Sequence, residues 1–283
     1  MSRPLLQPAI ESAKIVIEPQ GGWVPFHFHE LWEYRDLVYF FVWRDIKVRY
    51  KQTIIGGAWA VLQPFLTMVV FSIIFGYLAQ LPADGVPYPI LTFTALLPWQ
   101  LFAHALMQSS SSLVTHRQLI TKIYFPRLVI PMAAVLAGLL DFGIGFMVLL
   151  AMCFYYGIVP GVGMLAIPLF LLLTLATALA VGLWLAALNV QYRDIQSTLP
   201  FLTQFWLFIT PVAYSSSLVP ERWRALLGLN PMAGVVEGFR WALLGHSDNM
   251  GSLLPISVLI VAGLLLGGLI YFRRVEATFA DVV

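Results

Sequence analysis

The sequence predicts an all-α polytopic membrane protein with six transmembrane helices, an N-terminal amphipathic interfacial helix and short re-entrant helices between spans five and six. Hydrophobic residues make up 60% of the 283 residues, and the mean hydropathy is +0.84. A soluble chain of this length cannot bury so much apolar surface in one core, so lipid must solvate part of it. Several charge-free segments also reach the roughly 20 residues that cross a bilayer.

Three regions follow one another along the chain. Residues 1–25 contain four prolines and no signal-peptide core, which predicts a cytosolic lead. Residues 26–51 are predicted to form an interfacial and coupling region, and residues 52–283 the six-span domain. Within the second region, residues 30–42 are too charged to cross a membrane and too apolar to leave it. This composition indicates a helix that lies along the cytosolic membrane surface.

A dense basic segment joins this helix to the first span. Arg44, Asp45, Lys47, Arg49 and Lys51 lie within eight residues. On a helix, Arg44, Lys47 and Lys51 would share one face, and Asp45 would pair with Arg49. Either these charges serve anionic lipid head groups alone, or they also offer a surface to a cytosolic partner.

The apolar segments place the six spans at about 56–79, 88–115, 128–156, 163–189, 198–214 and 252–272. The third and fourth spans form one apolar stretch that turns at the glycine- and proline-rich residues 157–163. Asp141 alone interrupts this stretch. An acid inside a span is usually functional, and a structural hydrogen bond to a neighbouring helix is an equal alternative because no basic partner is evident.

The distribution of basic residues orients the chain. With both termini inside, 13 of the 16 basic residues are cytosolic: Arg3, Lys14, Arg35, Arg44, Lys47, Arg49, Lys51, Arg117, Lys122, Arg127, Arg193, Arg273 and Arg274. The other three, Arg222, Arg224 and Arg240, lie in one outer connection. The positive-inside rule therefore predicts that both termini are cytosolic.

The outer connection, residues 215–251, contains two apolar pieces at 223–229 and 232–244. Neither is long enough to span a bilayer, which predicts two short helices that re-enter the outer leaflet. Trp223 and Trp241 suit an interfacial position. A plain extracellular cap is the alternative.

Aromatic residues recur at helical spacing in two spans: Phe71 and Phe75 in the first, and Phe201, Phe205 and Phe208, with Trp206 beside them, in the fifth. A packing or lipid-facing stripe is the ordinary interpretation. The alternative is a conduit whose ring faces contact sugar rings. Gln63 and Gln204 would then supply polar points within otherwise apolar spans.

The motifs that are absent narrow the function. The chain has no GxxxxGK[ST], HExxH or GxSxG motif, and its single cysteine, Cys153, cannot form a disulfide or a cysteine metal site within the chain. An intramembrane polyprenyl-phosphate-dependent enzyme would need convergent carboxylates or a metal, which Asp141 and Asp194 do not obviously supply. A passive channel would leave the charged segment without a coupling task. We therefore expect no catalytic residue, metal or cofactor on this chain.

Six segments occur in an order typical of a known family. They are RDIKVRYKQTIIGGAWAVLQP, GVPYP…LLPW, LITKIYFPR, LNVQYRDI, ITPVAY and LNPM…EGFRWALLG. Together they resemble the permease subunit of type-2 ABC transporters, in the polysaccharide and polyol-phosphate branch that exports O-antigen, capsule or teichoic acid. The resemblance runs from about residue 30 to the C-terminus.

The resemblance implies an ATP-driven exporter in the bacterial inner membrane. It would move a lipid-linked glycan, carried on undecaprenyl diphosphate in the O-antigen case, from cytosol to periplasm. Two copies would form a homodimer served by two ATP-binding subunits, which would hold the ATP and Mg²⁺. No nucleic-acid partner is implied. An exporter of small drugs or lipids is the alternative within the same family.

The resemblance also assigns three sets of residues. Contact with the ATPase subunits would involve Arg44, Asp45, Lys47, Arg49, Lys51, Leu119, Lys122, Tyr124, Arg127, Tyr192, Arg193 and Asp194. The conduit would be lined by Trp59, Gln63, Phe71, Phe75, Trp99, Phe201, Gln204, Phe205, Trp206 and Phe208. The outer gate would contain Tyr214, Trp223, Asn230, Pro231, Glu237, Arg240 and Trp241.

Overall fold

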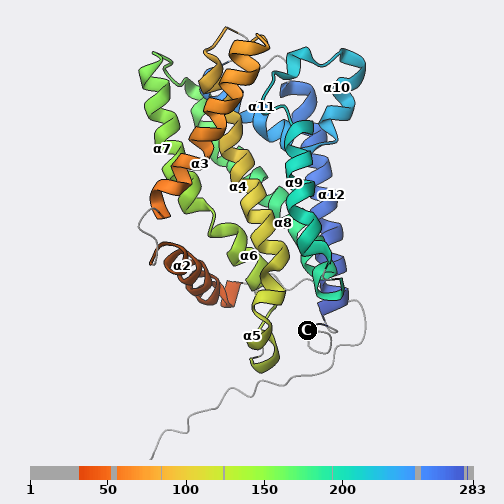
Figure 1. Ribbon diagram of the computed structural model, residues 1–283. Coiled ribbons are helices and arrows are strands. Elements are labelled where there is room, and N and C mark those ends of the chain that lie inside the picture. Colours follow the sequence, from red (N-terminus) through yellow and green to blue (C-terminus); the bar gives the residue numbers. More distant parts are fainter. Residues whose placement is uncertain are drawn as a thin grey trace, which may run out of the picture.

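The computed structural model describes residues 32–51, 56–83, 85–123, 125–192, 194–245, 250–276 and 279. Every regular element in these ranges is helical, which confirms the predicted all-α class. The long helices form one bundle (Figure 1). Helices α2 (Arg35–Lys51) and α5 (Arg117–Lys122) lie at one end of it, and α10 (Glu221–Gly228) and α11 (Pro231–Leu244) at the other.

Within the described residues, five helices are long and apolar enough to cross a membrane. The five spans are Gly57–Leu78, Tyr88–Thr115, Val129–Tyr155, Val162–Gln191 and Leu253–Glu276. The first consists of α3 (Gly56–Phe71) and a π-helical segment (Ser72–Leu78), the second is α4, and the third consists of α6 (Val129–Leu136) and α7 (Leu139–Tyr155). The fourth consists of a 3-10 turn (Val162–Ala166) and α8 (Ile167–Gln191), and the fifth lies within α12 (Met250–Glu276). These five match predicted spans.

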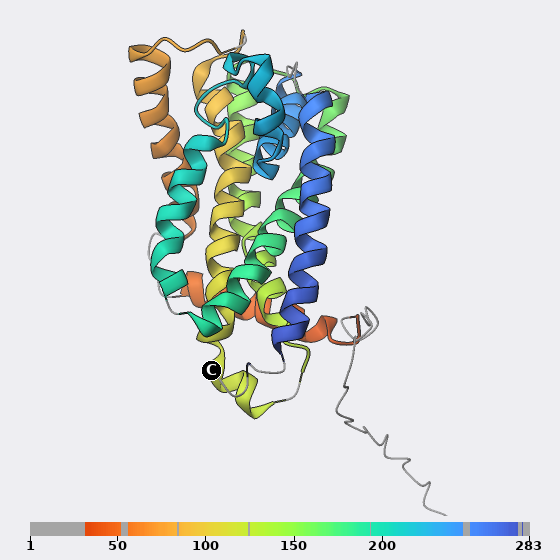
Figure 2. The same cartoon turned by 90° about the vertical axis from the view of Figure 1, so that its right-hand side faces the viewer.

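The remaining predicted span, 198–214, is also helical but has different bounds. Helix α9 covers Asp194–Ile209, 16 residues. At 1.5 Å per residue this is about 24 Å, less than the roughly 30 Å hydrocarbon core. Helix α9 runs beside α4 along the bundle (Figure 2). Its length falls below that of the five helices above.

Helix α4 is the centre of the bundle. In its most apolar window 78% of residues are buried, against 17–33% in the other four long helices. Those four therefore present large apolar faces outward, to lipid or to other chains. Pro98 lies inside α4, which a membrane helix tolerates when neighbouring helices satisfy the displaced backbone groups.

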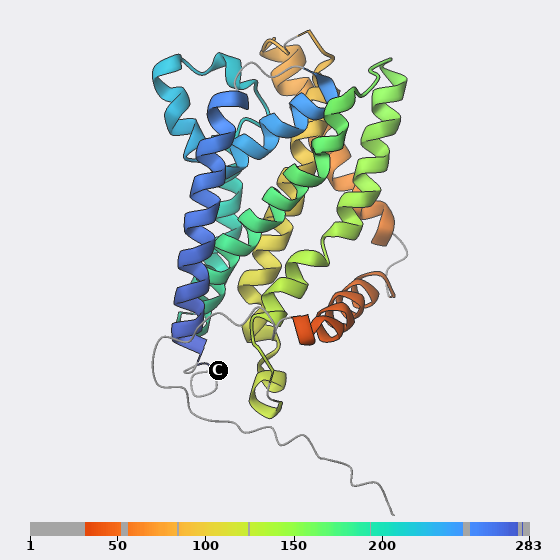
Figure 3. The ribbon, with the colours of Figure 1, turned by 180° about the vertical axis from the view of Figure 1, so that it is seen from behind.

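Two helices lie at the end of the bundle that we call the charged end, because they carry basic residues such as Lys47, Lys51 and Lys122. Helix α2 (Arg35–Lys51) lies across this end, and α5 (Arg117–Lys122) projects beyond it (Figure 3). An apolar cluster joins them, with Phe41 from α2, Ile120 from α5, and Phe125 and Phe272 nearby. Packing on Phe41 therefore holds α2 against the bundle.

The opposite end contains α10 (Glu221–Gly228), a 3-10 turn (Ser216–Leu218) and α11 (Pro231–Leu244). Helix α11 is buried along almost its whole length and packs on α4, α8 and α12. It ends at Gly245, whose φ of +72° is the left-handed conformation that favours glycine after a helix. The second apolar piece of the outer connection is thus a core helix.

The close packing of α11 gives a first prediction, for Gly238. A Cβ there would lie 2.4 Å from a ring carbon of Phe170, which is itself fully buried. We expect Gly238→Ala to lower the free energy of unfolding by about 2 kcal/mol through overpacking. Thermal unfolding of the detergent-purified chain would measure the effect.

Gly143 in α7 provides the matched control, because a Cβ there meets no atom within 4 Å. Gly143→Ala should stabilise the chain by about 0.5–1 kcal/mol through helix propensity. Equal melting temperatures for the two variants would contradict the packing argument.

Candidate functional site

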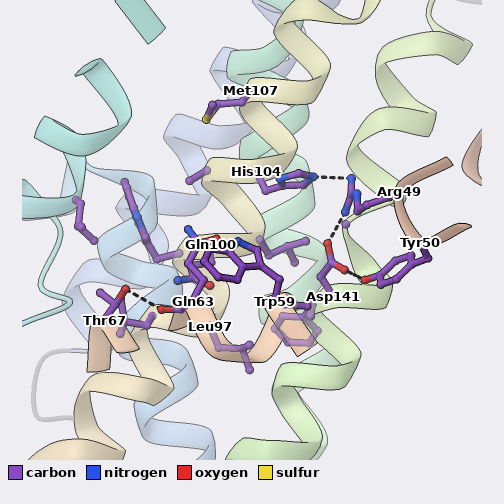
Figure 4. A pocket seen from close by; sticks show the side chains of 18 residues that line it. Arg49, Tyr50, Trp59, Gln63, Thr67, Leu97, Gln100, His104, Met107 and Asp141 are labelled. Carbon is purple, nitrogen blue, oxygen red and sulfur yellow. Dashed lines mark hydrogen bonds and ion pairs between the residues drawn. The ribbon is translucent and has the colours of Figure 1, made fainter. Parts of the chain in front are cut away.

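A cavity of about 930 Å³ opens among α2, α3, α4 and α7 (Figure 4). Helix α3 contributes Trp59, Gln63 and Thr67 to its wall, and α4 contributes Trp99 and Gln100. Indole rings and side-chain amides thus face the same space. Such a combination can contact a polyhydroxylated ligand through ring faces and hydrogen bonds.

Four polar side chains, which we call the inner cluster, lie at one end of this cavity: Arg49, Tyr50, His104 and Asp141. The Asp141 carboxylate accepts hydrogen bonds from the Arg49 guanidinium and the Tyr50 hydroxyl. Arg49 Nη2 also lies 2.6 Å from His104 Nε2. A guanidinium cannot accept a hydrogen bond, so His104 accepts through Nε2 and carries its proton on Nδ1. Asp141 thus has a basic partner, and its hydrogen bonds reach a neighbouring helix.

The cluster also perturbs Tyr50. Burial, together with the hydrogen bond to Asp141, raises the pKa of Tyr50 to about 12. The phenol therefore remains protonated at neutral pH, since its pKa lies well above 7. At neutral pH Tyr50 therefore keeps the proton with which it donates to Asp141.

A second arginine of α2 contacts the start of α5. Arg44 Nη2 lies 2.8 Å from Asp45 and also donates to His116 Nε2. His116 Nδ1 lies 2.8 Å from the Ser112 carbonyl, so this nitrogen carries the proton. The expected Asp45–Arg49 pair is therefore wrong: Asp45 binds its neighbour Arg44, because Arg49 is turned toward Asp141.

The predicted ATPase-contact residues divide into surface and packed groups. Those exposed at the charged end are Lys47, Lys51, Lys122, Tyr192 and Asp194. Leu119 is half-buried, and Arg127 bonds through its backbone and side chain to Glu276 at the end of α12. Tyr124 and Arg193 lie outside the described residues.

The predicted conduit residues also fall into different environments. Trp59, Gln63 and Trp99 line the cavity. The side chains of Phe201, Gln204, Phe205 and Phe208 are exposed on α9. Phe71 and Phe75 pack edge to face with ring centroids 5.5 Å apart.

Trp206 is partly buried and packs against the interior. Its ring centroid lies 5.0 Å from that of Phe102, and its Nε1 donates to Asn230 Oδ1 at 2.9 Å. Asn230 caps α11 by accepting from the Met232 amide, and it donates to Thr210 at 2.9 Å. These bonds tie α9 to the start of α11.

The predicted outer-gate residues are mostly buried. Arg240 lies 3.1 Å from Glu237 and donates to the carbonyl oxygens of Val212 and Tyr214, each at 3.1 Å. Asn230 and Pro231 are buried as well, whereas Trp223 is exposed and Trp241 lies at the edge of exposure. Arg240 thus fastens the segment after α9 to α11.

Sequence reasoning missed Tyr50, Gln100, His104 and His116. One signal was available: Gln100 and His104 are four residues apart in an apolar span, so they share a helix face. Nothing in the sequence linked that face to Arg49, which is 55 positions from His104 and 92 from Asp141.

Comparison with known proteins agrees with these features. Residues 36–244 match the ABC-2 type transporter family. The O-antigen export system permease protein RfbA of Myxococcus xanthus is 31% identical over 239 residues, which cover 82% of this chain and 91% of that protein. A Klebsiella pneumoniae protein of the same name is 28% identical over 251 residues, covering 88% and 95%. The polysialic acid transport protein KpsM of Escherichia coli is 22% identical over 236 residues, covering 83% and 92%.

The family match spans well over half of the chain and includes the cavity, the inner cluster and α11. The aligned relatives are matched over more than nine-tenths of their length. Membership implies a partnership with an ATP-binding subunit. The chain belongs to the ABC-2 type transporter family, as a multi-pass transport subunit of the bacterial inner membrane.

Proposed function

We propose that the chain is the permease subunit of an ATP-driven exporter of a lipid-linked polysaccharide, of the O-antigen type carried on undecaprenyl diphosphate. The cargo would pass from cytosol to periplasm. The observation that carries the proposal is the cavity, where Trp59 and Trp99 lie beside Gln63 and Gln100. The printed names of the relatives, O-antigen export permease and polysialic acid transport protein, agree with a glycan cargo.

In this proposal α9 completes a set of six spans, and both termini are cytosolic. Local thinning of the bilayer would accommodate its 16 residues. The exposed aromatic residues of α2, which include Tyr39, Phe40 and Trp43, would lie in the cytosolic interface. Helices α10 and α11 would re-enter the outer leaflet, with the exposed Trp223 at its surface.

Two copies would form the complete conduit. Large apolar side chains are exposed along α3 and α9, for example Phe65, Leu66, Phe201, Phe205 and Phe208. Exposed apolar side chains in this number contact lipid or another protein chain. A second copy facing α3 and α9 would enclose a path between the protomers, with aromatic rings along its wall.

ATP hydrolysis would occur on two separate nucleotide-binding subunits, which would hold the ATP and Mg²⁺. Those subunits would push on α2 and α5, the two short helices at the charged end (Figure 1). The apolar cluster that contains Phe41 and Ile120 would make α2 and α5 respond together. The movement would then reach the cavity through the end of α2.

A gene deletion tests the cargo. Cells of the source organism that lack this chain should lose a surface polysaccharide and accumulate its lipid-linked precursor inside. Complementation with the intact gene should restore export. Unchanged surface glycan in the deletion strain would contradict the proposal, and loss of drug or lipid efflux in the same strain would indicate the alternative cargo class.

Charge reversal at two exposed lysines tests the contact with the ATPase subunits. Lys47 and Lys51 are exposed on α2, whereas Arg44 is committed to Asp45 and His116. The double variant Lys47→Glu, Lys51→Glu should reduce export by about tenfold or more, since like charges across an interface cost several kcal/mol. The measurement is surface glycan per unit of permease in the membrane.

The charge-conserving pair Lys47→Arg, Lys51→Arg is the control and should export normally. Undiminished export by the glutamate variant would exclude this face of α2 from the contact.

A further inference from the structure

The inner cluster joins three elements. Arg49 and Tyr50 come from the last turn of α2, His104 from the middle of α4, and Asp141 from the first turn of α7 (Figure 4). All four residues also line the cavity. One set of hydrogen bonds therefore links the helix proposed to meet the ATPase subunits with the wall proposed to meet the glycan.

The environment of the Arg49–Asp141 pair suits repeated opening. Its two side chains are 28% and 27% exposed, whereas those of Arg240 and Glu237 are 3% and 4% exposed. Separating a fully buried pair strands two charges without water, which is strongly unfavourable. Because more than a quarter of each inner side chain is exposed, both groups can gain contacts with solvent when they part, so their separation costs less than that of the outer pair. The inner pair can open, and the outer pair stays closed.

The remaining contacts of α2 concentrate movement at its last turn. Phe41, in the first half of α2, is buried in the apolar cluster with Ile120 and Phe125. Arg49 and Tyr50 instead hold their end of the helix through polar bonds. Separating packed apolar side chains exposes them to water, which is unfavourable. A polar group that loses its protein partner can instead form a hydrogen bond to water.

Because Asp141 lies at the start of α7, a movement of the end of α2 that displaces Asp141 also displaces α7. Helix α6 ends at Leu136 and α7 begins at Leu139, so Asp141 lies in the first turn after the break between them. Gly138 occupies this break and approaches Leu101 of α4 so closely that a Cβ would lie 2.9 Å from its Cδ1. A displacement of Asp141 therefore moves the start of α7 and the adjacent cavity wall.

We propose, resting on the proposed function, that the inner cluster is a releasable latch. Arg49, Tyr50, His104 and Asp141 are positioning residues that hold the end of α2 on α4 and α7 and keep the cavity from widening. A push on α2 by the ATPase subunits parts Arg49 from Asp141, the charges become hydrated in the cavity, and α7 moves away to admit the glycan. Asp141 acts through Arg49 and Tyr50 and does not itself bind the cargo.

Asp141→Asn tests the latch in the complex of permease and ATPase subunits, reconstituted with the source organism's lipid-linked glycan. Asparagine can still accept from Tyr50 but no longer attracts Arg49 as a charge. We expect the ATP hydrolysed per glycan exported to rise about fivefold, within the range of coupling between sites. Asp141→Glu should return this ratio toward that of the wild type, and Glu221→Gln on α10, where Glu221 is 90% exposed, should leave it unchanged.

A structural role alone predicts a different result for Asp141→Asn. Loss of a static brace would lower hydrolysis and export together through loss of folded complex, and their ratio would stay constant. A constant ratio in Asp141→Asn would therefore overturn the latch.

A cleavable cross-link tests release directly. Arg49→Cys and Asp141→Cys, in a Cys153→Ala background that removes the buried native thiol, can be joined by a short bifunctional thiol reagent. Cross-linked complexes should export at least about tenfold less glycan, and reductant should restore export to the level before cross-linking. Equal export with and without the cross-link would overturn the proposal.

The wild-type complex, measured in parallel, separates failure of the latch from failure of the proposed function. If the wild type exports no lipid-linked glycan, the proposed function is wrong. If it exports normally and either test gives its contradicting result, a constant ratio in Asp141→Asn or equal export with and without the cross-link, the proposed function stands and the latch is wrong.

Discussion

Replacing Arg240 with methionine is expected to destabilise the folded chain by about 3–5 kcal/mol, the cost of breaking a buried ion pair from one side. The Arg240 guanidinium lies 3.1 Å from Glu237 and donates to the carbonyl oxygens of Val212 and Tyr214. Methionine fills a similar volume but leaves a buried carboxylate and two carbonyl groups without this donor. Thermal and denaturant unfolding of the detergent-purified chain would measure the loss.

Arg224 supplies an unusually close control. It pairs with Glu221 at the same i,i+3 spacing, also in a helix of the outer connection, but Glu221 is 90% exposed. Exposed pairs contribute about 0–1 kcal/mol. Arg224→Met should therefore change stability by about 1 kcal/mol or less, and equal losses in the two variants would contradict the assignment of Arg240 as a buried brace.

Trp206→Ala should cost about 3 kcal/mol of stability, at the lower end of values for truncating a large aromatic residue because Trp206 is not fully buried. The change removes the edge-to-face contact with Phe102 and the donor to Asn230 Oδ1. Because Asn230 caps α11, its loss of a partner weakens the join between α9 and α11. Unfolding measurements and the amount of permease in the membrane would both report the effect.

Phe205, the neighbouring aromatic, should behave in the opposite way. It is 57% exposed on α9, so Phe205→Ala should change stability by only about 0.5 kcal/mol. If exposed rings on α9 contact sugar, this variant should instead lower the glycan exported per permease. Full export by Phe205→Ala would remove Phe205 from the conduit, and wild-type stability of Trp206→Ala would contradict its packing role.

The chain itself determined the helical class and the bounds of most long helices. Tyr88–Thr115 begins and ends where the sequence predicted, because Pro87, Pro89 and the polar residues after Thr115 delimit an apolar run of membrane length. The fifth predicted span was less accurate. Apolar residues continue past Ile209, but the backbone leaves the helix there and Arg240 binds the carbonyl groups that follow.

The candidate site was predictable in part. Trp59, Gln63 and Trp99 were expected at a conduit and do line one cavity. The expected Asp45–Arg49 pair failed because helical spacing describes contacts within one helix, whereas Arg49 reaches Asp141 on another. Helical spacing also could not show that Phe205 is exposed on α9 whereas its neighbour Trp206 packs on Phe102, because that difference depends on contacts between helices.

The sequence by itself determined the features that depend on partitioning between lipid and water. These are the helices of membrane length, the basic residues gathered near a few junctions, and the absence of charged residues other than Asp141 from the spans. Those properties depend on local composition, and the transfer of each segment into a bilayer is nearly independent of the others. The tertiary structure alone decided which polar groups meet. The partner of Asp141 lies 92 residues away, and only the packing of α2 on α6, next to the start of α7, brings Arg49 and Tyr50 to it.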